Sequence, residues 1–502
     1  MSRWGLDERL GGPLGRHAHP RGIFFDPAPW AVLCATVVWL LGIYRVTPCV
    51  QHEVTKPVDP YHRLCYSDIP VIYQTSGMGR GGSLLGTHGI EANPVVVAVM
   101  AACRWITGLF AEVGPKASDQ QVLDAANTYW AVAQVVLFAA FLAVVIATML
   151  LGRGSDAGLL GRVSDPRVDV DPSGRLVGGR RRSWDVFWVA ASPLVFLAGI
   201  IDFSMVSVAL AMLSALAWSR RRPVLAGVLV GLGCAANLEV AVLVFAVVIA
   251  CLRTTQLRPL SHYLAAGVGV WALCEGLAAW ANPSAWWHHL HSTFWSGTGL
   301  GSIWFLVNDS TGATIPGVGW ITGALTVAGL LALTWLALTV PRRPRLAQLA
   351  CLALLVIFVT HKEFSPQNVL LLVPLAALAR PDWRDWTVLT VCEGLYQAAV
   401  WAHLGNMSIP GGTTSDVLYW AAILVRMAGE IWFAWGIVDD IRRPWNDTVR
   451  ADYCDDPLGG VLDHAPDGRD EPDPEAPGHE CAPMLGREPA SGVGNPAEEQ
   501  RR

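Results

Sequence analysis

The sequence carries few charged residues for its length. Only 15% of its 502 residues are Asp, Glu, Lys or Arg, and 53% are hydrophobic, whereas soluble domains average about 25% charged residues. This shortage of charge excludes a disordered chain and argues against a soluble enzyme. The net charge of −5 is small and comes mostly from the tail, so nucleic acid is not an indicated partner. The composition therefore predicts a protein of the lipid bilayer.

Nucleotide and metal motifs are also missing. The sequence has no Rossmann or P-loop glycine pattern, and its 11 cysteines show no CxxC spacing of the kind that holds metals. The run HHLH at 288–291 is a weak exception. Adjacent histidines point apart on a helix, and His and Trp residues together are typical of a membrane interface. We therefore expect neither a cofactor nor a metal ion.

Long apolar runs dominate what is present. A membrane-spanning helix needs about 20 mostly apolar residues. The expected spans are 30–46, 127–152, 184–200, 203–219, 261–281, 318–340, 347–360, 367–379, 387–404 and 416–437. The segment 223–252 is too long for one span and short for two, so we expect a bent hairpin or two half-helices broken near Asn237. These runs predict an all-α polytopic membrane protein with about 10–12 transmembrane helices.

Arginine clusters give the expected orientation, because Lys and Arg concentrate in cytoplasmic loops. All the arginine clusters lie on the cytoplasmic side under two conditions. The hairpin 223–252 must return to the side of the membrane from which it starts, and the apolar stretch 93–113 must lie at the outer interface without crossing. Both termini are then cytoplasmic, and 47–126 forms a large first outer loop. The first apolar run follows polar residues and has no cleavage site, so we expect it to stay as an anchor.

The same distribution divides the chain into three parts. Residues 1–29 form a cytoplasmic N-terminus, 30–437 the transmembrane domain, and 438–502 a cytoplasmic tail. From about 445 the tail is rich in Asp, Glu, Pro and Gly, so we expect it to be largely disordered. Cys49 and Cys65 share the outer loop, where a disulfide is permitted, and the sequence leaves their pairing open.

Three acids stand where the topology places the outer surface. Asp68 in YSDIPVIY either begins a helix as its cap or does chemistry. Glu91 in GIEANPVVV is either a first-turn acid favoured by the helix dipole or part of a site. Asp202 lies between two apolar runs, where it either caps the next helix or faces a polar cavity. Polar groups at membrane depth are functional candidates.

A further polar segment separates two expected spans. His361, Lys362, Glu363, Ser365 and Gln367 fall within seven residues, which is either a plain loop or a site where cations bind a phosphate.

Two charged residues lie inside the last two expected spans. We expect Glu393 and Arg426 to pair with each other or with another buried charge.

Several of these segments resemble one known family. YSDIPVIY, GIEANPVVVAVM, the block 183–245 and above all HKEFSPQNVLLLVPLAALARPDWRDW are similar to motifs of the actinobacterial mannosyltransferase-like membrane proteins of glycosyltransferase family 87, in the GT-C superfamily. DYCDDPLGGVLD resembles a tail found in one branch. The resemblance covers roughly residues 30–465 and implies a GT-C-like helical bundle.

The resemblance also implies an activity. A sugar, typically mannose, would pass from a polyprenyl-phosphate donor to a cell-envelope glycan or glycolipid acceptor at the outer face, with inversion. Asp68 would act as general base, and Lys362 and His361 would stabilise the departing phosphate. Glu91, Asp202, Ser365 and Gln367 would help to bind the substrates.

Two cationic residues of the family pattern are missing from this sequence. Asn237-Leu238-Glu239 stands where the family carries a Lys, and 292–304 contains no Arg. Two other functions therefore stay open. One is a catalytically weak member that binds a polyprenyl lipid or a partner protein, and the other is a lipid or sugar transporter, although the break near Asn237 has no matching twin.

Overall fold

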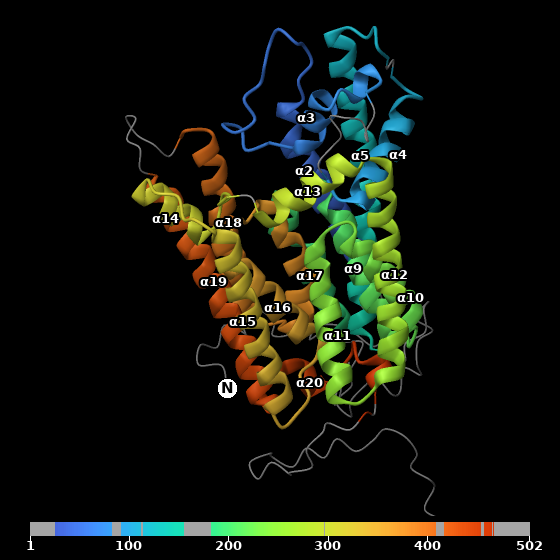
Figure 1. The fold of residues 1–502 in the computed structure, drawn as a ribbon, viewed down its shortest axis with the longest axis vertical. Coiled ribbons are helices and arrows are strands. Elements are labelled where there is room, and N and C mark those ends of the chain that lie inside the picture. Colours follow the sequence, from blue (N-terminus) through green and yellow to red (C-terminus); the bar gives the residue numbers. More distant parts are fainter. Residues whose placement is uncertain are drawn as a thin grey trace, which may run out of the picture. The chain divides into compact units, whose positions relative to one another are not determined.

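Helices built from the apolar runs make up the fold. The computed structural model describes residues 26–82, 92–111, 114–154, 182–295, 297–407, 416–452, 456–463 and 465, and within these ranges it contains helices and no strand (Figure 1). The first half comprises α2 (Ala28–Val46), α3 (Asp68–Thr75), α4 (Pro94–Thr107), α5 (Asp119–Gly152), α7 (Phe187–Ala190), α8 (Pro193–Ala198), α9 (Ser204–Ser219), α10 (Pro223–Cys234) and α11 (Ala241–Arg253). The second half comprises α12 (Leu257–Ala281), α13 (Pro283–Trp295), α14 (Ile303–Thr311), α15 (Val318–Thr339), α16 (Leu346–Thr360), α17 (Val369–Ala379), α18 (Trp383–Leu404), α19 (Val417–Arg442) and α20 (Thr448–Asp452). The prediction of an all-α protein is confirmed for the described ranges.

Helices cover all the expected spans, with two differences. The span expected at 184–200 is divided into a 3-10 turn, α7 and α8, because Pro193 begins α8 and lacks the amide that a continuous helix would need. The span expected at 127–152 begins earlier, at Asp119. Ser118 caps it, since its hydroxyl accepts from the Gln121 amide while its own amide donates to the Gln121 side chain.

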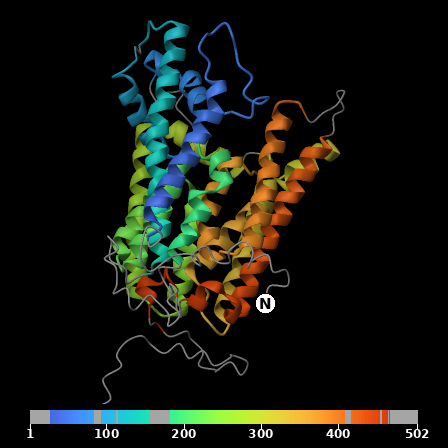
Figure 2. The ribbon, with the colours of Figure 1, turned by 180° about the vertical axis from the view of Figure 1, so that it is seen from behind.

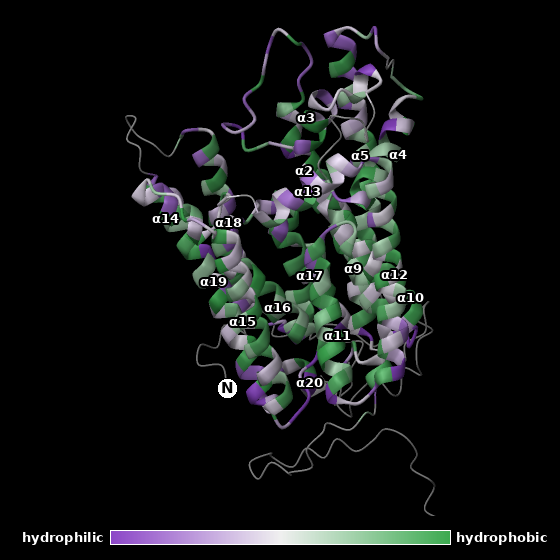
Figure 3. Ribbon diagram, in the orientation of Figure 1, coloured by the Kyte–Doolittle hydropathy of each residue, from purple (hydrophilic) through white to green (hydrophobic). Residues whose placement is uncertain are grey.

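The bundle presents apolar side chains outward. Five described helices, α2, α5, α12, α15 and α19, are long and apolar enough to cross a membrane by length and composition. Large residues such as Leu331 and Trp335 of α15 and Trp435 of α19 are exposed. In Figure 3 hydrophobic residues follow the helices of the bundle, while hydrophilic residues gather in the loops and turns at their ends. An exposed apolar surface of this extent is typical of contact with lipid.

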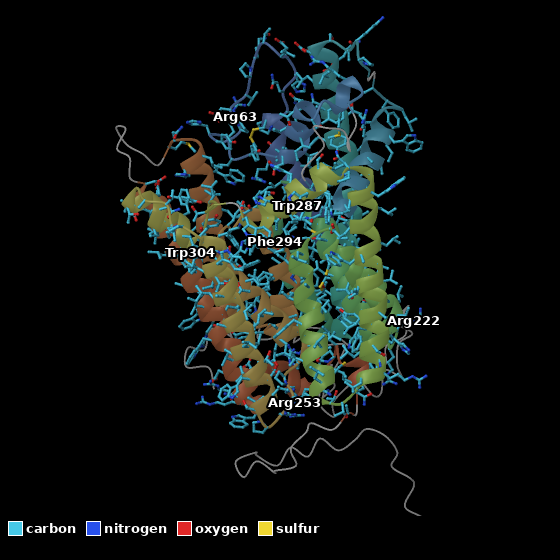
Figure 4. All side chains as sticks on the ribbon, viewed as in Figure 1. Arg63, Arg222, Arg253, Trp287, Phe294 and Trp304 are labelled. Carbon is cyan, nitrogen blue, oxygen red and sulfur yellow. A yellow bond between two sulfur atoms is a disulfide. The ribbon has the colours of Figure 1, made fainter. Side chains whose placement is uncertain are left out.

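The segment 223–252 forms the predicted hairpin of two half-helices. α10 has 12 residues and α11 has 13, and the chain turns between them at 235–240. α10 packs on α9 and α12. A Cβ atom on Gly227 or Gly231 would overlap backbone carbonyls of α12, so small residues allow this close helix contact. Arg222 precedes α10 and Arg253 ends α11, and both lie in the lower part of the bundle (Figure 4), so the hairpin returns to the end from which it starts.

The arginine clusters gather at that end. Arg253 donates to the carbonyls of Val340 and Pro341 between α15 and α16, and Arg220 donates to the Leu150 carbonyl near the end of α5. Figure 4 shows Arg222 and Arg253 in the lower part of the bundle and Arg63 near its upper end. This grouping agrees with the distribution from which the orientation was predicted; the side of the membrane on which it lies remains a prediction.

The opposite end carries the large loop 47–126. α5 has 34 residues, about 51 Å at 1.5 Å per residue, so it extends beyond a hydrocarbon core of about 30 Å. α3 and α4 pack against α5, and Figure 2 shows α2 beside α5 from behind. α4 has only 14 residues, too few to cross the core unaided, which is consistent with the expected interfacial position.

Part of the tail is ordered, contrary to the expectation of disorder from 445. Asp447, Asp456, Leu458 and Leu462 are buried. Asp447 accepts two hydrogen bonds from the buried guanidinium of Arg345, and Asp456 accepts from the Leu346 amide at the start of α16. The acids that made this segment look disordered instead neutralise a buried arginine and cap a helix. Residues 466–502 lie outside the described residues.

Candidate active site

The segments that were expected at the outer face meet around one cavity of about 680 Å³. Of the seven residues to which the family resemblance gives a role, six line it: Asp68, Asp202, His361, Lys362, Ser365 and Gln367. The seventh, Glu91, lies outside the described residues. Because these six come from three segments more than a hundred residues apart, only the fold could bring them together.

Backbone hydrogen bonds hold the segments in place. The Asp68 amide donates to the Ile201 carbonyl over 2.8 Å, and the Gly299 amide donates to the Lys362 carbonyl over 2.9 Å. The Val95 amide donates to the Ala235 carbonyl over 3.1 Å at the turn of the hairpin. These bonds join the segments of the cavity wall in pairs.

Asp68 is the first residue of α3, but its side-chain hydrogen bond goes to Tyr66 and not to a backbone amide of the helix. Its Oδ1 accepts from the Tyr66 hydroxyl over 2.6 Å. The Ser67 hydroxyl, which could cap α3, donates instead to the carbonyls of Ile200 and Ile201. Burial raises the pKa of Asp68 above its ordinary value, and the Tyr66 hydrogen bond lowers it in part. The carboxyl is thus available on the cavity wall.

Asp202 fulfils both of its alternative roles. It accepts from the amide and hydroxyl of Ser204 over 2.9 and 2.8 Å at the start of α9, and it lines the cavity. Burial raises the pKa of Asp202 to about 6; the Ser204 bonds and the Gln367 side chain lower it, and the Asp68 carboxyl raises it. Asp202 and Asp68 are therefore close enough to influence each other.

The polar segment 361–367 supplies a cation to the cavity. Lys362 is 3% exposed, and burial lowers the pKa of its ammonium while Glu363 raises it. Phe364 anchors the segment, because its amide donates to the Leu300 carbonyl over 2.9 Å and its carbonyl accepts from the Tyr396 hydroxyl over 2.8 Å. These hydrogen bonds fix the position of the segment that carries Lys362.

Several polar residues that line this cavity had no role assigned from the sequence. Among them, Asn237 and Glu239 lie at the turn of the hairpin and His289 lies on α13. His289 contacts the Asn93 side chain over 3.2 Å. The break near Asn237 was the available signal, since a broken helix at membrane depth needs a polar environment.

The cavity also has an apolar wall. Met100, Phe294, Val327, Ile357 and Phe358 contribute to it from α4, α13, α15 and α16. Figure 4 labels Phe294 beside Trp287 in the upper part of the molecule. A polar half and an apolar half in one cavity suit a ligand that has a charged head and a hydrocarbon chain.

Arg426 pairs with another buried charge, as expected. Its guanidinium donates to Glu430 over 2.7 Å, and both side chains are fully buried. Glu393 interacts with both. Arg426 also lies 3.7 Å above the centre of the Phe364 ring. This charge cluster therefore braces the segment that carries Lys362.

The structure also describes the two cysteines of the large loop and the histidine run 288–291. Cys49 and Cys65 form a disulfide with Cα atoms 5.9 Å apart, an ordinary separation for such a bridge. His291 stacks on Trp295. Among the described residues, no group of three or more His, Cys, Asp or Glu side chains could hold a metal ion.

Two solved structures of ArnT from Cupriavidus metallidurans align with this chain. The one bound to undecaprenyl phosphate is 12% identical and the one in the apo state is 15% identical; each alignment covers 83% of this chain and 78% of the ArnT chain, with a TM-score of 0.38. No protein-family profile matches the sequence, and no curated protein matches it either.

Proposed function

We propose that this protein is an integral-membrane glycosyltransferase of the GT-C type, which transfers a hexose, most simply mannose, from a polyprenyl-phosphate donor to a cell-envelope glycan or glycolipid. The observation that carries the proposal is the common cavity of Asp68, Asp202 and Lys362. The sequence resemblance to family 87 supports it, because the Lys-x-x-Ser-Pro-Gln block of that resemblance lines the same cavity.

Asp68 is proposed as the general base. An acceptor hydroxyl would give its proton to Asp68 while its oxygen bonds to the anomeric carbon. The bond between that carbon and the phosphate oxygen breaks on the opposite face, which inverts the configuration. Burial supports this role, because a raised pKa makes the carboxylate a stronger proton acceptor than an exposed one.

Lys362 and His361 are proposed to stabilise the phosphate that leaves. Charge develops on the phosphate oxygens as the bond breaks, and a cation in a desolvated cavity lowers the energy of that state more than one in water. Ser365 and Gln367 supply hydrogen bonds, Asp202 and Glu91 bind substrate hydroxyls, and the apolar wall accommodates the start of the lipid chain. The site would face the outside, with both termini cytoplasmic.

The test is transfer of labelled mannose from synthetic polyprenyl-phosphate mannose by membranes that contain the protein. We expect transfer with the wild-type chain, transfer reduced by about 10²–10⁴-fold with Asp68→Asn, and no transfer from a nucleotide-linked sugar. A purified chain that binds polyprenyl phosphate but transfers no hexose would instead support a lipid-binding protein without activity.

A further inference from the structure

A second cavity of about 120 Å³ lies beneath the outer loop. α3 separates it from the main cavity. Ile69 and Ile72 of α3 line the main cavity, while Pro70, Val71 and Gln74 line the second. Successive helix residues turn by about 100°, so these two sets lie on different faces of the helix. The volume is that of about four waters in the liquid, enough for part of a small polar ligand.

The lining of the second cavity combines apolar side chains, such as Val46, Val58 and Leu123, with aromatic and polar side chains that carry no charge. Tyr66 and Trp130 contribute rings, and Gln51, Gln74 and Asn127 contribute amides. No charged side chain lines it among the residues that the structure describes. This absence disfavours a phosphate or another ion, and the amides disfavour a hydrocarbon chain. Amides and aromatic rings together suit a ligand with hydroxyl groups on an apolar ring.

The cavity has firm walls. The Cys49–Cys65 disulfide forms one side of it. The Asn127 side chain of α5 donates to the Gln51 carbonyl over 2.9 Å and ties the loop to that helix. A cavity held in this way needs little ordering when a ligand enters, which favours binding.

One donor in the lining lacks an acceptor. The indole Nε1 of Trp130 is buried without a hydrogen-bond partner in the part of the chain that the structure describes. A buried donor without an acceptor is unfavourable. Because Trp130 lines the cavity, a ligand oxygen placed against its indole edge would supply an acceptor.

The second cavity is linked to the proposed base by one side chain. Tyr66 lines the cavity, and its hydroxyl donates to Asp68. A sugar unit against Tyr66 therefore touches the residue that orients the carboxylate.

We propose that the second cavity binds an uncharged sugar unit of the acceptor glycan, at a distance from the hydroxyl that reacts beside Asp68. The assignment to the acceptor rests on the proposed function. An oligosaccharide would pass the start of α3, with its reacting sugar in the main cavity and an earlier sugar against Trp130 and Tyr66. The acceptor is then an oligosaccharide or polysaccharide, and a single sugar uses only part of the site.

Binding without donor tests the sugar cavity by itself. The full-length chain in lipid nanodiscs is applied to an array of uncharged oligosaccharides and monosaccharides, and the Kd of each retained sugar is measured. We expect retention of oligosaccharides and an increase in Kd of up to about tenfold in Trp130→Phe, which keeps an aromatic ring but removes the N–H donor. Trp105→Phe changes an exposed Trp of α4 outside both cavities and should leave Kd unchanged.

Transfer kinetics separate this inference from the proposed function. With an oligosaccharide acceptor, Trp130→Phe should raise KM and leave kcat unchanged, and with a monosaccharide acceptor it should change neither. Transfer with equal KM in the wild type and Trp130→Phe would overturn the sugar cavity and leave the glycosyltransferase standing. Oligosaccharide binding that Trp130→Phe weakens, without any transfer, would keep the sugar cavity and reject the transferase. An array that retains no oligosaccharide overturns the cavity assignment.

Discussion

The Tyr66 hydroxyl donates a hydrogen bond of 2.6 Å to Oδ1 of Asp68. Burial raises the pKa of this carboxyl, and the tyrosine opposes that rise because its hydrogen bond favours the ionised form. Burial and the Tyr66 hydrogen bond therefore have opposite effects on the pKa of the proposed base. Replacing Tyr66 by Phe removes the hydrogen bond and leaves the effect of burial.

Tyr66→Phe should shift the pH dependence of transfer. The base must be ionised, so the rate rises with pH through the pKa of Asp68. Without the hydroxyl that lowers this pKa, the acidic limb of kcat/KM should move to higher pH, while the rate above that limb stays close to wild type. A pH–rate profile measures the shift, and Tyr44→Phe on the exposed side of α2 is the control. An acidic limb at the wild-type position would contradict the role of Tyr66.

Asp68→Asn should reduce transfer by about 10²–10⁴-fold, the usual contribution of general-base catalysis. The amide keeps the size of the side chain and serves almost equally well at a helix cap, so folding and membrane insertion should be unchanged. Asp59→Asn is the matched control, because Asp59 is an exposed acid of the same loop. Wild-type turnover in Asp68→Asn would assign the base to Asp202 or Glu91.

Lys362→Ala should raise KM for the lipid-phosphate donor by about tenfold to a hundredfold, since a hydrogen bond to a charged group contributes about 1.5–3 kcal/mol. KM for the acceptor should stay the same. Kinetics with each substrate varied in turn provide the measurement, and Lys56→Ala in the exposed loop provides the control. An increase confined to the acceptor KM would show that Lys362 does not contact the phosphate.

The peptides that contain Cys49 and Cys65 should be joined by their disulfide in the intact protein. Alkylation before reduction should modify neither cysteine, and alkylation after reduction should modify both, as followed by mass spectrometry of the digested chain. Modification of either residue in the unreduced protein rejects the bridge.

Lys56→Cys should react in intact cells with a thiol reagent that does not cross membranes, because the outer loop is predicted to lie outside. Arg443→Cys, exposed at the arginine-rich end, should react only after permeabilisation. The wild-type chain gives the background of its own cysteines. The opposite pattern would reverse the orientation and place the cavity inside.

The apolar runs and the arginine clusters were enough to predict the helices, the return of the hairpin at Asn237 and the segments that build the site. They could not predict which polar residues face one another. Asp68 and Lys362 come together through the packing of the bundle, and only the break near Asn237 and a missing cation drew attention to Glu239. Glu430 was detectable, because it stands four residues after Arg426 and shares its helix face.

In the tail, amino-acid composition alone was a poor guide to which residues are ordered. Asp, Glu, Pro and Gly indicate disorder on average, but Asp447 and Asp456 are complementary to arginines and amides of α16. The apolar side chains of Leu458 and Leu462 were the local signal for packing. Composition over a long window therefore concealed a short segment that folds onto the bundle.

The ion pair of Arg345 with Asp447 has a consequence for the order in which the protein is made. The two residues are 102 positions apart, and both are 1% exposed. During synthesis the ribosome reaches Asp447 only after α16 to α19 have been made, so until then Arg345 lacks its counter-ion. A buried arginine without a partner costs several kcal/mol. We therefore expect a chain that stops before Asp447 to leave Arg345 without this counter-ion and to be less stable at its arginine-rich end.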